Sequence, residues 1–148
     1  MHHLDLLGAP LKDDFLCELF ETYEVQVEYL YDRTHEDLPD EYHAEIVDLG
    51  LQFVFDDRQA LRTLFLTPVD ISTFNPFEDD ERVPMFVSKA EALNYASANG
   101  SNFTEGEADF LGEQKDWIRF ESDAYTIHYE FVDGGLRKTT LQSVADCV

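Results

Sequence analysis

The chain of 148 residues carries 32 Asp and Glu against 10 Lys and Arg, a formal net charge of −22, although 44% of its residues are hydrophobic and 14% are aromatic. This apolar content excludes an acidic disordered chain, and the length is sufficient for one folded domain without a metal or a disulfide. The negative charge opposes direct binding to nucleic acid.

The first expected element is an amphipathic helix over about 10–22. Apolar residues recur at helical spacing between Leu11 and Phe20, with acidic residues between them. Pro10 is typical of a first helical turn, and early acidic residues favour a helix N-terminus. Cys17 falls in this apolar pattern, so we expect a buried thiol there.

Antiparallel strands are expected after this helix. Alternating apolar and polar residues over 25–31 predict a strand, and the polar residues 32–43 are typical of a long loop. The same criteria predict strands over 45–49, 51–55 and 61–66, with a turn at 56–59.

The second half of the chain begins after a Pro-rich acidic connection at 68–83. Ser88-Lys89-Ala90-Glu91 is a capping box that predicts a helix over 88–98, and Asn99-Gly100 is a typical helix end. A loop rich in Gly and Glu is expected up to Asp116. Strands are then predicted over 117–120, 125–131 and 136–144, with a hairpin turn at 133–135.

The order of a helix followed by antiparallel strands therefore occurs twice. We interpret it as a weak internal duplication with halves of about 1–67 and 84–144. The prediction is a single α+β domain over 1–148, with a mainly antiparallel sheet and the helices on one face. A parallel doubly wound sheet is not expected, because consecutive strands lack long helices between them.

No pattern predicts catalytic chemistry. Residues 34–43 contain two His and four acidic residues, but they lack the ligand spacing of zinc sites and of calcium loops. Nucleophile motifs and a Gly-rich phosphate loop are also missing from the sequence. We therefore predict no catalytic residue, no metal ligand and no cofactor, and a protein that is not an enzyme.

The expected location is the cytoplasm. The N-terminal residues lack the basic and apolar regions of a signal peptide, and no apolar run reaches the length of a membrane span. Two cysteines do not form a disulfide framework, which favours a reducing compartment.

Acidic residues are concentrated between Asp13 and Asp57, where fifteen carboxylates accompany one cation, Arg33. Like charge at this density destabilises a compact fold, which indicates a partner with a positive face. A solvated surface without a partner is the alternative. Tyrosine beside acids supplies contact area and a cation–π face, and binding residues concentrate in loops. The predicted partner-binding residues are Glu36, Asp37, Asp40, Glu41 and Tyr42, and secondarily Glu78, Asp79, Asp80 and Glu81.

Five segments carry a resemblance to a known group of proteins: 6–11, 50–56, 61–66, 88–92 and 125–129. In these segments the chain resembles the small acidic immunity proteins that bacteria encode beside antagonistic toxins. The resemblance implies tight, inhibitory binding of a cognate toxin with a basic surface, often a nuclease or another enzyme that acts inside the cell. The alternatives are an acidic DNA mimic or phage-type inhibitor of a nucleic-acid enzyme, a general adaptor, and an enzyme whose site the sequence hides.

Overall fold

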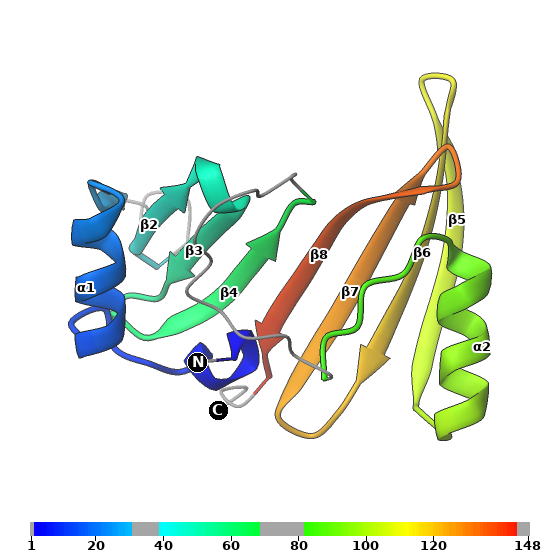
Figure 1. Cartoon of the computed structure of the whole chain (residues 1–148), viewed down its shortest axis with the longest axis horizontal. Coiled ribbons are helices and arrows are strands. Elements are labelled where there is room, and N and C mark those ends of the chain that lie inside the picture. The colour runs from blue at the N-terminus through cyan, green and yellow to red at the C-terminus, as the bar shows by residue number, and fades with distance from the viewer. Residues whose placement is uncertain (1, 31–38, 69–81, 145–148) are drawn as a thin grey trace.

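The computed structural model describes residues 2–30, 39–68 and 82–144, and its framework is one eight-stranded antiparallel sheet with two α-helices (Figure 1). The coarse prediction of an α+β fold with a mainly antiparallel sheet is confirmed. The strand order is β1-β2-β3-β4-β8-β7-β6-β5. The elements are α1 (Asp14–Thr22), β1 (Glu28–Leu30), β2 (Glu41–Ile46), β3 (Leu51–Phe55), β4 (Leu61–Leu66), α2 (Lys89–Asn99), β5 (Phe103–Phe110), β6 (Glu113–Glu121), β7 (Tyr125–Val132) and β8 (Gly135–Ser143), with short 3₁₀ helices at His3–Leu6 and Val47–Leu49.

Each half of the chain has the same order of elements. In the described residues, α1 precedes the meander β1 to β4, and α2 precedes the meander β5 to β8. The halves join through their last strands, because β4 pairs antiparallel with β8 and places Leu64 opposite Leu141. Internal duplication of the sequence stays a prediction.

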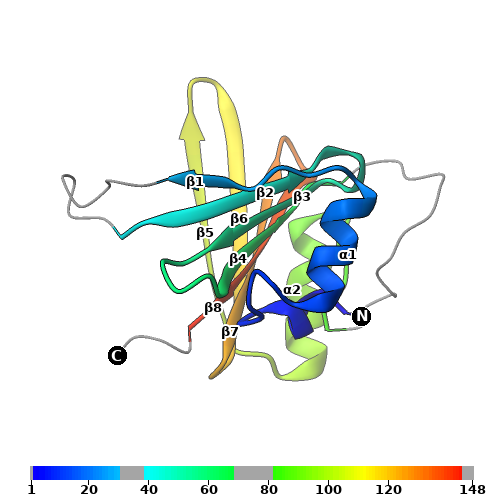
Figure 2. The same ribbon diagram turned by 90° about the vertical axis from the view of Figure 1, so that its left-hand side faces the viewer.

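The hydrophobic core lies on the face of the sheet that the helices cover. The register aligns Phe53, Leu64, Leu141 and Ile127 in one row across four neighbouring strands, and each of these side chains is buried. The ring of Phe20 in α1 contacts Phe53 edge-on, with the ring centroids 5.1 Å apart. Figure 2 shows both helices on the same side of the sheet.

The sequence pattern locates α2 better than α1. The Ser88 hydroxyl accepts a hydrogen bond from the Glu91 N–H, and Gly100 ends α2 with a left-handed φ of 63°. Helix α1 begins later than predicted, because the Asp13 carboxylate caps it by accepting hydrogen bonds from two backbone N–H groups. Pro10 lies outside this helix, where it forms an isolated bridge with Ala60.

The predicted loop up to Asp116 is wrong, because β5 and the start of β6 occupy most of it. Strand β5 is an edge strand that combines Gly106 with three acidic residues. Gly106 lies opposite Trp117, and a Cβ at this position would approach atoms of the indole ring to 2.6 Å. Because Gly106 has no side chain, the indole ring of Trp117 fits beside the edge strand.

Three smaller predictions also need correction. The loop predicted over 32–43 is wrong at its end, because β2 begins at Glu41. The strand predicted over 45–49 is interrupted by the 3₁₀ helix Val47–Leu49, which Gly50 ends with a left-handed φ of 65°. Cys17 is exposed rather than buried, because it lies on the outer side of α1.

Candidate functional site

The negative charge of the described residues is concentrated in the N-terminal half. Residues 2–30 and 39–68 hold thirteen Asp and Glu against three Lys and Arg. Residues 82–144 hold ten Asp and Glu against six Lys and Arg, so acids and bases are closer to balance there. A surface that attracts a basic partner is therefore to be sought around β1 to β4.

One end of this half forms an open groove of about 690 Å³, which we call the acidic groove. The start of β2, the turn between β3 and β4, and the end of β8 enclose it. Four carboxylates and two guanidinium groups line it: Asp40, Glu41, Asp56, Asp57, Arg58 and Arg62. Of the predicted binding residues, Asp40 and Glu41 are brought together here. Glu36, Asp37 and the secondary segment of Glu78, Asp79, Asp80 and Glu81 lie outside the described residues.

Asp56 has a structural role within the acidic groove. Its carboxylate accepts hydrogen bonds from the backbone N–H groups of Arg58 and Ala60, at 2.9 and 3.0 Å, and from Arg62 Nε at 2.7 Å. Partial burial disfavours its charged form, but these hydrogen bonds outweigh that effect and hold the pKa of Asp56 below its ordinary value. The neighbouring Asp57 is exposed. Asp57 is therefore better placed than Asp56 to meet a partner.

A stacked tyrosine pair stands beside the acidic groove. The rings of Tyr29 in β1 and Tyr42 in β2 are 4.6 Å apart between centroids and inclined by 15°. The Tyr29 hydroxyl donates a 2.6 Å hydrogen bond to Asp40 Oδ2. Glu41 and Tyr42 were predicted to lie in a loop, but both belong to β2. Strand pairing therefore holds these side chains in place.

The Tyr29–Asp40 hydrogen bond gives the groove a measurable titration. Hydrogen bonding to Asp40 is the main cause that raises the pKa of Tyr29 from 10.0 to about 12. The contact favours the neutral phenol, so its stabilising effect is complete below pH 10 and is lost as the pH rises through 12. An ultraviolet titration of phenolate should show one tyrosine with this raised pKa. Asp40→Asn should bring that pKa down toward 10, and an unchanged titration would contradict the contact.

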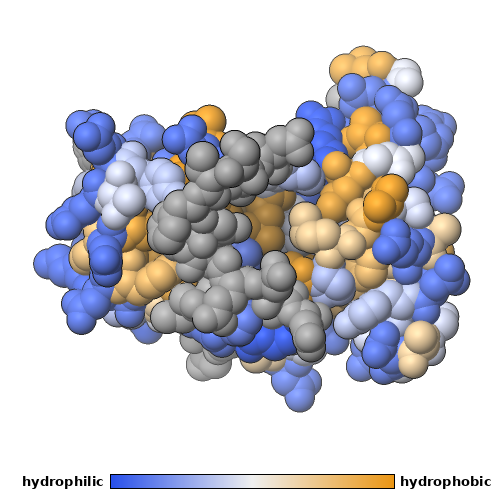
Figure 3. Space-filling view, in the orientation of Figure 1, coloured by the Kyte–Doolittle hydropathy of each residue, from blue (hydrophilic) through white to orange (hydrophobic). Residues whose placement is uncertain are grey.

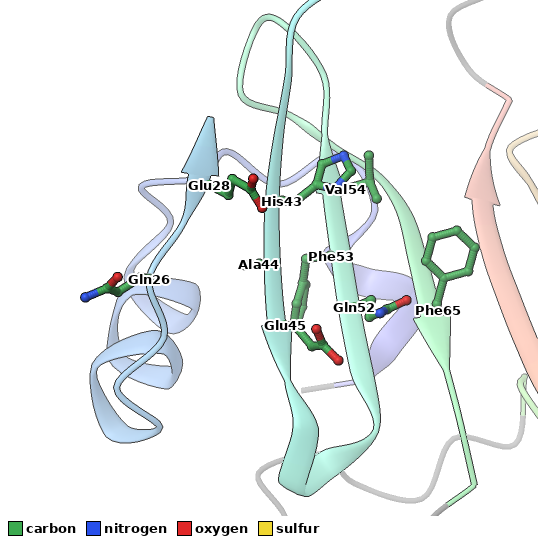
Figure 4. A pocket seen from close by; sticks show the side chains of 9 residues that line it. All are labelled: Gln26, Glu28, His43, Ala44, Glu45, Gln52, Phe53, Val54 and Phe65. Atoms are coloured by element: carbon green, nitrogen blue, oxygen red, sulfur yellow. The ribbon is translucent and has the colours of Figure 1, made fainter. Parts of the chain in front are cut away.

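A second hollow lies on the face of the sheet opposite the helices. It has a volume of about 350 Å³, and Figure 4 shows side chains from β1 to β4 around it. His43 is one of the residues that line it, with Nε2 3.2 Å from Glu41 Oε1. Among the described residues that line this hollow, none carries a hydroxyl or thiol nucleophile. Within the described ranges, His, Cys, Asp and Glu form no group of three that could hold a metal ion.

Comparison with known proteins finds no family model that matches the chain, no similar curated protein and no solved structure with a matching fold. Among the residues that the structure describes, no helix combines the length and the apolar character needed to cross a membrane. Statements about function therefore depend on the geometry and charge of the site.

Two features of the acidic groove were not predicted from the sequence. Asp57 joins Asp40 and Glu41 there, although a turn and two strands separate them along the chain. The only signal in the sequence was that Asp57 ends the acidic stretch. Tyr29 flanks the acidic loop in the sequence, but its ring stacking and its hydrogen bond to Asp40 depend on the register of β1 with β2.

Proposed function

We propose that this chain is a cytoplasmic binding protein that neutralises a cognate bacterial toxin with a basic surface, as immunity proteins do. The observation that carries the proposal is the acidic groove, where Asp40, Glu41 and Asp57 meet on paired strands and a tight turn. The stacked pair of Tyr29 and Tyr42 adds an aromatic surface beside these carboxylates. Tyrosine next to acids suits contact with Arg and Lys side chains.

Physical chemistry gives such a protein a reason for its charge. A toxin that acts on nucleic acid needs a basic cleft, and a surface complementary to that cleft is acidic. Complementary charge raises association rates by about 10- to 1000-fold at low salt. A protecting protein must bind its toxin before the toxin acts, so a high association rate has a direct benefit.

The test is affinity capture of the full chain from cells that naturally contain it, followed by a toxicity assay. We expect one basic protein to bind the wild-type chain. Its expression alone should arrest growth, and co-expression of this chain should restore growth. The double variant Asp40→Lys/Asp57→Lys should capture less of it, whereas Glu18→Lys/Asp123→Lys, with the same change in net charge at two exposed sites outside the groove, should capture it normally.

The outcomes separate the competing classes of function. A captured basic protein that is harmless when expressed alone would contradict neutralisation of a toxin. A captured enzyme that binds DNA, competes with DNA for this chain and does not arrest growth would indicate a DNA mimic. Equal capture by the two double variants would exclude the acidic groove as the binding surface.

A further inference from the structure

The hairpin of β5 and β6 ends in a two-residue turn with an unusual residue. The last strand pair is Phe110 with Glu113, which leaves Leu111 and Gly112 to form the turn. Their φ angles are 51° and 84°, so both residues are in the left-handed region. A turn of this kind strongly favours Asn-Gly or Asp-Gly, because most side chains disfavour that conformation.

The hairpin of β7 and β8 provides an internal comparison. Its two-residue turn consists of Asp133 and Gly134, with φ angles of 52° and 86°. The two turns therefore share their backbone conformation, and one of them has the preferred Asp-Gly sequence. Leu111 occupies the position that Asp133 holds in the other turn. Turn formation does not explain a leucine there.

Packing does not explain this leucine either. Leu111 is 89% exposed, more than any other large hydrophobic residue that the structure describes. Figure 3 shows hydrophobic colouring at the tip of this hairpin, at the upper right of the view. The fold thus gains neither core contacts nor favourable turn geometry from Leu111. A side chain that is unfavourable in both respects points to a role in contact with another molecule.

The tip projects from the molecule. The Asp133 N–H donates to the Gln114 carbonyl oxygen at 3.1 Å, so the neighbouring turn reaches only the level of Gln114. The β5–β6 hairpin continues beyond that level, and Figure 1 shows its tip above the turn between β7 and β8, where β8 starts. Strand β8 starts at this end of the sheet and runs to the acidic groove. Its last residues, Gln142 and Ser143, line that groove. The tip and the groove therefore lie at opposite ends of the sheet.

The stem below the tip is acidic. Glu105, Glu107 and Asp109 alternate along β5 and so lie on one side of this strand, which contains no Lys or Arg. Lys89 of α2 approaches Glu107 only to 3.9 Å, measured from Nζ to Oε1. Glu113, next to the turn, is half exposed and lies 3.6 Å from Arg137. The complementary surface for an apolar tip on an acidic stem is an apolar pocket with a basic border.

We propose that the β5–β6 hairpin is a second binding element, which inserts the Leu111 side chain into an apolar pocket bordered by Lys or Arg on another protein. Insertion buries a side chain that is otherwise in water, which is the main source of affinity at the centre of protein interfaces. The acidic stem orients the hairpin toward the basic border. This contact is independent of the acidic groove, because the two surfaces lie at opposite ends of the sheet.

The test places a photo-crosslinking amino acid at Glu113 in the full chain, so that Leu111 is kept. We expect one basic protein to be crosslinked in cells that naturally contain the chain. Adding Leu111→Asn should abolish this adduct, whereas the matched change Asp133→Asn at the other turn should not. Asn-Gly is the preferred sequence for this turn, so Leu111→Asn is expected to keep the hairpin intact.

The second part of the test measures the affinity of this chain for the partner that crosslinking identifies, purified on its own. Leu111→Asn should weaken binding at least tenfold, mainly through faster dissociation, with an unchanged dependence on salt. Leu111→Met, which keeps an apolar tip, should stay within threefold of the wild type. No adduct, an adduct that survives Leu111→Asn, or equal affinities would overturn the proposal. So would binding of the wild-type chain, lost in Leu111→Asn, to phosphatidylcholine vesicles, because that result would make the tip a lipid-binding element.

Discussion

Replacing Leu141 by alanine is expected to lower the free energy of unfolding by about 2–5 kcal/mol. Leu141 is fully buried on β8 and lies opposite Leu64, which is fully buried on β4. In the described residues, the pairing of β4 with β8 joins the two four-stranded meanders into one sheet. The lost methyl groups would leave a cavity where the two halves meet.

Gln142→Ala provides the matched control for this prediction. Gln142 is the next residue along β8, but its side chain is exposed on the opposite face of the sheet. The control should change the free energy of unfolding by no more than about 0.5 kcal/mol. Urea unfolding measures both variants, with two signals recorded in parallel: circular dichroism and the fluorescence of Trp117, the single tryptophan of the chain.

A double-mutant cycle tests the register itself. Leu64→Ala and Leu141→Ala, combined in one chain, should show a coupling of about 0.5–3 kcal/mol, as residues in direct contact do. Additive effects for Leu64 and Leu141 would contradict the side-chain contact that the register of β4 with β8 implies.

Local chemistry in the sequence predicts the elements of this fold better than their pairing. The capping box at Ser88, the alternation over 51–55 and 125–131, and the Asp-Gly turn at 133 each correspond to an observed element. Strand β5 was missed because its acidic residues and Gly106 have low strand propensity. Its strand conformation comes from pairing with β6 along its full length, which is a tertiary effect.

The candidate site was less predictable than the fold for a related reason. Charge density identified the N-terminal half as the acidic region, but the carboxylates of a region differ in what they contact. The Asp56 carboxylate accepts hydrogen bonds from the backbone of its own turn and from Arg62, whereas the neighbouring Asp57 is exposed. The sequence does not show which of two adjacent Asp residues makes structural contacts and which is exposed. That difference depends on the strand register and on the geometry of the turn.

The charge-reversal variant Asp40→Lys/Asp57→Lys is expected to slow association with the captured basic protein by about 10- to 100-fold at low salt. Both residues line the acidic groove, and neither side chain is part of the hydrophobic core. Asp40→Lys removes the hydrogen bond from Tyr29, which is an exposed contact at the edge of the sheet. The fold should therefore be retained, and circular dichroism checks this.

The dependence on salt identifies the cause of the slower association. At about 1 M ionic strength the screening length falls to about 3 Å, so the difference in rate between the variant and the wild type should largely disappear. The control Glu18→Lys/Asp123→Lys changes the net charge equally, but its two sites are exposed and lie outside the groove. If the groove steers the partner, the control should lose no more than about threefold in rate, because local potential rather than total charge guides docking. Equal slowing in both variants would mean that the overall charge attracts the partner and that the groove does not recognise it.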